Sequence, residues 1–169
     1  MNKKLRTMLI YLLATIIIFL IGAIIIIKND LKVIEVTGHS MYPTLTEKNY
    51  VLSTNYEELK NGDIILFNHE NTRMIKRVIG IPGDTISITE EGLVYVNNEL
   101  LKEDYINKHQ GQFQNEIKYP ITINEGEYFV LGDNRLDSLD SRIISVGNIK
   151  EEEIIGKIAF VLYPPKSLK

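Results

Sequence analysis

A serine stands in the stretch TGHSMYPTL, residues 37–45, and a serine hydroxyl attacks a carbonyl only when a nearby base removes its proton. Three histidines are candidate bases. His39 is adjacent to Ser40, and in an extended segment its side chain points to the opposite face. His69 and His109 lie in polar stretches typical of loops. We therefore interpret all three histidines as surface residues.

Lysine is the remaining candidate base, and it acts only when it is neutral. An ordinary lysine has lost its proton in roughly one molecule in a thousand at neutral pH, so burial must lower its pKa. Lys76 has a suitable setting, because in a strand it shares a face with the apolar Met74 and Val78. A lone strand lysine is more often a surface residue with a buried stem, so this pattern leaves both interpretations open.

Several other chemistries are disfavoured. GHSMY, residues 38–42, has a tyrosine where the G-x-S-x-G motif of α/β hydrolases needs its second glycine. No spaced cluster of metal ligands such as H-E-x-x-H occurs, and no cysteine is present. The net charge of −3 argues against nucleic acid as a partner. We expect no cofactor, no metal and no nucleic acid.

An apolar run precedes the serine. Residues 8–27, MLIYLLATIIIFLIGAIIII, carry no charge, and as a helix they would span roughly 30 Å, the thickness of a bilayer core. A cleavable signal peptide would have a shorter apolar core and a small-residue cleavage site. A buried helix of a soluble protein would need cover on all sides. We predict a single transmembrane anchor at 8–27.

Positive charges on either side of the run indicate its orientation. Lys3, Lys4 and Arg6 precede it, and Lys28 and Lys32 follow it, which favours a cytoplasmic N-terminus by one charge. This predicts residues 1–7 in the cytoplasm and residues 28–169 on the outer side of the cell membrane.

Residues 28–169 suit one domain, and their pattern is mostly β. Short runs rich in Ile, Val, Tyr and Phe alternate with turn residues, and Asn97-Asn98 resembles a tight hairpin turn. We expect an exposed loop at 102–120, which is polar, and a solvated turn at the three glutamates 151–153. The predicted strands are 33–37, 50–54, 63–68, 73–79, 85–89, 93–96, 127–131 and 157–162.

Four motifs in succession resemble those of a known family. They are SMYPT (40–44), GDIIL (62–66), KRVIGIPGD (76–84) and GDNRLDSLDSR (132–142). Together with the preceding anchor they are similar, in order and type, to the bacterial type I signal peptidases, which are membrane-anchored serine/lysine proteases. The short segment between the third and fourth motifs is similar to that of the compact Gram-positive members of the family.

The resemblance implies a role for each matching residue. Ser40 would be the nucleophile, Lys76 the general base, and Ser138 would hydrogen-bond the lysine amine. Asp140 would form an ion pair with Arg142, and Asp133 would pair with Arg77; Gly83, Asp84 and Gly132 would shape turns.

One position departs from the pattern. Some family members have a serine two residues before the nucleophile, which contributes to the oxyanion hole, and here that position is Gly38. The Ser40 N–H would then act with a second donor that the sequence does not identify.

The resemblance also implies a substrate and a location. The substrates would be exported preproteins with signal peptides. Thirteen residues from Ile27 to Ser40 reach at most about 43 Å, which keeps the serine near the membrane lipid. Two alternatives remain: a repressor-type self-cleaving protein with a similar Ser/Lys pair, and a catalytically silent membrane-anchored binding module.

Overall fold

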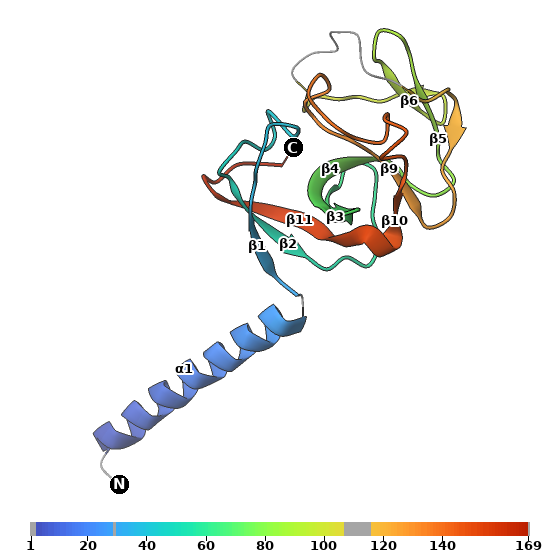
Figure 1. Cartoon of the computed structure of the whole chain (residues 1–169). Coiled ribbons are helices and arrows are strands. Elements are labelled where there is room, and N and C mark those ends of the chain that lie inside the picture. Colours follow the sequence, from blue (N-terminus) through green and yellow to red (C-terminus); the bar gives the residue numbers. More distant parts are fainter. Residues whose placement is uncertain (1–2, 29, 107–115, 169) are drawn as a thin grey trace. The chain divides into compact units, whose positions relative to one another are not determined.

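The computed structural model describes residues 3–28, 30–106 and 116–168, and the chain forms two compact units, Met1–Leu31 and Lys32–Lys169 (Figure 1). The first unit contains helix α1, Lys3–Lys28. Its segment Lys3–Ile25 has the length and composition to cross a membrane, and at about 1.5 Å per residue it is about 35 Å long. Its apolar side chains are exposed, as in Phe19, which is 78% exposed. The helix is consistent with a single-pass membrane anchor.

The second unit is built from two antiparallel sheets. The larger sheet has the strand order β1-β2-β11-β3-β4-β9-β10, and the smaller has the order β7-β6-β5-β8. A short 3₁₀ helix, η1 (Glu151–Glu153), leads into the last strand. The strands are β1 (Lys32–Glu35), β2 (Tyr50–Thr54), β3 (Ile64–His69), β4 (Thr72–Gly80), β5 (Thr85–Ile88), β6 (Val94–Val96), β7 (Glu99–Leu100), β8 (Ile121–Thr122), β9 (Glu127–Leu131), β10 (Ile149–Lys150) and β11 (Ile154–Tyr163).

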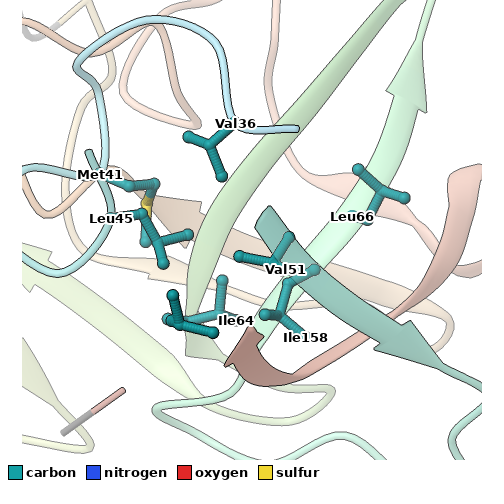
Figure 2. Close-up of a cluster of buried hydrophobic side chains, with 8 residues drawn as sticks. Val36, Met41, Leu45, Val51, Ile64, Leu66 and Ile158 are labelled. Atoms are coloured by element: carbon teal, nitrogen blue, oxygen red, sulfur yellow. The ribbon is translucent and has the colours of Figure 1, made fainter. Parts of the chain in front are cut away.

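Successive side chains of a strand point to opposite faces, so β3 and β9 each contribute to two buried clusters. In β3, Ile64 and Leu66 pack in one buried cluster, shown in part in Figure 2, and the residues between them pack in a second. In β9, Tyr128 and Val130 join the second cluster, and their neighbours join a third. The third cluster also takes Ile86 and Val94 of the smaller sheet, so it joins the two sheets. Both faces of these strands are buried, which is why they are apolar runs.

The predicted mostly β fold is confirmed. All eight predicted strands are present to within a few residues, and Asn97 and Asn98 have φ of 52° and 67° in the turn between β6 and β7, as a tight hairpin requires. The two-residue strands β7, β8 and β10 are not among the predicted strands, because so short a strand carries no periodicity of its own.

The predicted exposed loop at 102–120 is wrong at its start. Glu103 is buried, and Tyr105 lies over the Arg77 guanidinium, 4.0 Å from ring centroid to Cζ. A polar side chain tolerates burial when it finds partners, and those partners are far away in sequence. The predicted surface residue His109 lies outside the described residues.

Candidate active site

Ser40 lies in the turn that connects β1 to β2. The Tyr42 N–H donates to the His39 carbonyl at 3.0 Å, and the Leu45 N–H donates to the Met41 carbonyl at 2.8 Å. Met41 and Leu45 are buried in the core cluster of Figure 2. The turn that carries the half-buried serine is therefore anchored by apolar side chains directly after it.

Lys76 lies on β4, opposite Ile65 of β3. Its side-chain nitrogen Nζ is 2.6 Å from Ser40 Oγ, which is hydrogen-bond distance, and the residue is only 4% exposed. Of the neighbours predicted to share its face, Val78 belongs to the second core cluster and the half-buried Met74 packs against it. The structure thus brings the predicted nucleophile and the predicted base together.

Burial lowers the pKa of Lys76 to about 8. The Asp140 carboxylate opposes this effect and the Arg142 guanidinium adds to it; the carboxylates of Asp133 and Asp137 also raise the pKa. The net result is an amine that loses its proton far more readily than an ordinary lysine, which is what a base for a serine hydroxyl needs.

Ser138 differs from expectation. Its Oγ is buried and has no hydrogen-bond partner among the described residues, so the predicted bond to Lys76 is not formed. The lysine amine instead faces Ser40, while Ser138 Oγ lies against Gly132. A Cβ added at Gly132 would stand 2.5 Å from the Ser40 carbonyl oxygen and would overlap Ser138 Oγ. Gly132 is therefore required by close packing against the Ser40 backbone.

Both predicted ion pairs are present, and both are buried. Arg77 donates to the two oxygens of Asp133 at 2.8 Å and 2.7 Å, and Arg142 donates to the two oxygens of Asp140 at 2.7 Å and 2.8 Å. Asp140 also accepts the Gly132 N–H at 3.0 Å. These paired bonds fix the 132–142 turn beside the serine.

Gly83 and Asp84 form the predicted turn after β4. Gly83 has a φ of +87°, a left-handed conformation that favours glycine. Asp84 accepts hydrogen bonds from the side chains of Asn61 and Asn97 at 2.8 Å and 2.7 Å. The carboxylate therefore joins three turns, which is a structural role.

A cleft of about 520 Å³ opens beside Ser40 and Lys76, within the second unit. Val36 and Ile75 contribute apolar walls to the cleft. Gly38 lines the cleft with a φ of +79° and open space where a side chain would begin. The backbone conformation suits glycine, and this position offers no side-chain donor.

Histidines and metal ligands are not gathered at this site. His39 lines the cleft next to Ser40 but Lys76 holds the serine hydroxyl. His69 is bonded through its two ring nitrogens to Glu153 and to the Ser145 carbonyl, each at 3.0 Å. Among the described residues no group of three His, Cys, Asp or Glu side chains could hold a metal ion.

Sequence reasoning missed one buried pair beside the site. Glu103 and Arg135 form an ion pair with almost no exposure. Glu103 stands in a polar stretch with no periodicity, and Arg135 lies in the fourth motif without an assigned partner. A pair joined only by the tertiary fold leaves no local pattern.

A serine hydroxyl at hydrogen-bond distance from a buried lysine, on an antiparallel β domain, is the arrangement of a serine–lysine hydrolase. The family model described as signal peptidase, peptidase S26, matches residues 7–163. The chain therefore belongs to the type I signal peptidases, the serine endopeptidases of family S26.

Individual relatives agree with this assignment. The chain is 40% identical to signal peptidase I T of Bacillus subtilis, over 76% of this chain and 72% of that one. It is 35% identical to signal peptidase IB of Staphylococcus aureus, over 100% of this chain and 95% of that one. A crystal structure of a signal peptidase I from Enterococcus faecalis matches with a TM-score of 0.52 and 32% identity, covering 62% of this chain and all of that one.

Proposed function

We propose that this protein removes signal peptides from exported preproteins, with Ser40 as the nucleophile and Lys76 as the general base. The observation that carries the assignment of roles is the 2.6 Å separation of Ser40 Oγ and Lys76 Nζ at a buried lysine. Membership of the signal peptidase family supports the substrate class.

The first half of the reaction forms an ester. The neutral Lys76 amine takes the Ser40 hydroxyl proton while Oγ attacks the carbonyl carbon of the scissile peptide bond. Lys76 then gives this proton to the leaving nitrogen, the C–N bond breaks, and the mature protein departs. The signal peptide remains bound to Ser40 through its carbonyl carbon.

The second half hydrolyses that ester. Lys76 takes a proton from a water molecule, the resulting hydroxide attacks the ester carbon, and Ser40 Oγ leaves and regains a proton from Lys76. In both halves the oxyanion is stabilised by the Ser40 N–H and a second donor. Because Gly38 has no side-chain donor and a missing donor costs about 3 to 4 kcal/mol, a backbone N–H or a water fills this place.

The cleft supports binding of an extended peptide. Its walls include residues of β1, which is at an edge of the larger sheet, and of β4, which carries the base. An extended chain can pair with a sheet edge and place alternate side chains into pockets. Small side chains at the first and third positions before the cut would occupy shallow pockets beside Val36 and Ile75.

The anchor supports a location at the membrane. We place α1 across the cell membrane in contact with lipid, with residues 1–7 in the cytoplasm, and the catalytic unit on the outer side. A preprotein then meets the enzyme as it leaves the bilayer.

Alanine at either catalytic position tests the proposal. We expect Ser40→Ala and Lys76→Ala in the full chain to abolish processing of a preprotein in membranes. Lys76→Arg is also expected to be inactive, because a guanidinium does not lose its proton in a protein.

Lys60→Ala provides the matched control, since Lys60 is an exposed lysine outside the cleft. A serine-directed acylating probe should label the control and the wild type but not Ser40→Ala. Undiminished cleavage by Ser40→Ala or Lys76→Ala would contradict the assignment of roles.

A further inference from the structure

A buried carboxylate from the smaller-sheet region reaches the turn that packs on the nucleophile. The Glu103 side chain is 0% exposed and accepts hydrogen bonds from Nη1 of Arg135 at 2.9 Å, from Nη2 of Arg135, and from the Tyr105 hydroxyl at 3.0 Å. Glu103 lies three residues after the end of β7, and Leu101, directly after that strand, packs against the third core cluster. The carboxylate is thus held by Arg135 and Tyr105 close to the end of a strand of the smaller sheet.

Arg135 also bonds to the backbone of Gly132, which lies beside Ser40. Its Nε donates to the Gly132 carbonyl at 3.1 Å, while the Gly132 N–H donates to Asp140 at 3.0 Å. Both polar groups of Gly132 are therefore occupied, and this residue packs against the Ser40 carbonyl. That same carbonyl accepts the Asn134 N–H at 3.0 Å.

A second contact ties the far end of the same excursion to the same turn. The Glu116 N–H donates to the Arg142 carbonyl at 3.0 Å, and the Glu116 carboxylate accepts the Ile144 N–H at 2.9 Å. The described ends of the 102–120 segment are both attached to the turn that carries Asp140 and Ser138.

We propose that Glu103 is a positioning residue for the reaction: by holding Arg135 it fixes Gly132, and through Gly132 it fixes the Ser40 backbone relative to Lys76. This inference rests on the proposed function and adds a residue outside the four motifs. The chain of contacts runs from Glu103 to Arg135, from Arg135 to the Gly132 carbonyl, and from Gly132 to Ser40.

The test must separate positioning from folding. Removal of Glu103 alone leaves a buried arginine without its partner, which destabilises a protein strongly, whereas an apolar pair of similar volume is tolerated. The informative variant is therefore the double substitution Glu103→Leu with Arg135→Met in the full chain in detergent. It removes the link to Gly132 while the space stays filled.

We expect this double variant to stay folded, with a lower unfolding temperature because the Gly132 carbonyl and the Tyr105 hydroxyl lose these partners, and to keep the wild-type KM for a preprotein. Its kcat and its rate of Ser40 acylation by a serine-directed probe should fall about 10- to 100-fold, the loss produced by a displacement of about 1 Å at a reacting group. Wild-type kcat in the folded double variant would overturn the inference.

Arg135→Lys is a second variant that keeps the charge. One ammonium cannot reproduce the paired bonds to Glu103 together with the bond to Gly132, so kcat should fall here as well, with KM unchanged. If Arg135→Lys retains full kcat, the inference is wrong even where the double variant fails to fold.

Two controls accompany these measurements. Asp104→Asn alters the neighbouring exposed pair, in which the Lys102 and Asp104 side chains are 85% and 76% exposed, and should leave kcat unchanged. Ser40→Ala must be inactive while the wild type cleaves. If Ser40→Ala cleaves the preprotein as well as the wild type does, the proposed function is wrong. If Ser40→Ala is inactive and the double variant is fully active, only the role of Glu103 is wrong.

Discussion

In the proposed mechanism the chemistry depends on the side-chain amine of Lys76. Desolvation lowers its pKa to about 8, so at pH about 7 a tenth of the molecules, rather than one in a thousand, carry the neutral base. Burial of the Lys76 side chain lowers the pKa, and the nearby carboxylates limit how far it falls. A base poised near the working pH combines sufficient neutral fraction with sufficient basicity.

This pKa predicts the pH dependence of acylation. In the proposed mechanism only neutral Lys76 accepts the serine proton, so the rate of Ser40 acylation by a probe should fall as pH decreases through about 8 and level off above it. Asp137 lines the cleft and its carboxylate raises the pKa of Lys76, so Asp137→Asn should move the midpoint to lower pH. A rate that does not change between about pH 6 and pH 10 would contradict Lys76 as the base.

Strand β4 places two cations side by side with different roles. Lys76 contacts the serine, and Arg77 is the partner of Asp133 and also donates to the Gly62 carbonyl at 2.8 Å. Successive strand residues point to opposite faces, so adjacent positions serve the reaction and the scaffold separately. The neighbouring arginine thereby connects β4 to the turn before β3 and to the 132–142 turn.

The buried ion pair of Arg77 and Asp133 should make the fold sensitive to removal of either partner. Asp133→Ala should lower the free energy of unfolding by about 3 to 5 kcal/mol, because Arg77 would stay buried without its counter-charge. Urea unfolding of the full chain in detergent, followed by tyrosine fluorescence, measures this change; the protein has nine tyrosines and no tryptophan.

Asp104→Ala is the comparison for this experiment. Its ion pair with Lys102 is exposed and should contribute about 1 kcal/mol or less. An equal loss in the two variants would show that the Asp133 pair does not stabilise the fold as argued.

The whole molecule combines an apolar helix with a β catalytic unit in one chain. The segment Lys3–Ile25 of helix α1 is apolar and none of it is buried. A protein surface of this kind is stable in a lipid environment and unstable in water.

The proposed orientation can be measured, since the chain has no cysteine and any introduced thiol is unique. An impermeant thiol reagent should label Glu90→Cys, on the exposed turn between β5 and β6, in intact protoplasts. Asn2→Cys should be labelled only after the membrane is opened. The reverse pattern would place the catalytic unit on the cytoplasmic side.

Local patterns in the sequence predicted the apolar helix and the strands. They also made Ser40 and Lys76 candidates, and the family resemblance selected them as a pair. Hydrophobic runs and period-two alternation act between neighbours, so they are visible without the fold. The roles of Arg77 and Asp133 as partners came from the family resemblance, and the structure contains that pair.

Only the tertiary structure decided which distant groups meet. The sequence placed Glu103 in an exposed loop, yet it is buried against Arg135, 32 positions away, and Ser138 lies against Gly132 rather than bonding Lys76. Even the 2.6 Å contact of Ser40 and Lys76 joins residues 36 positions apart. Such contacts arise when sheets pack and exclude water, and a polar residue that will be buried looks the same in sequence as one that will stay exposed.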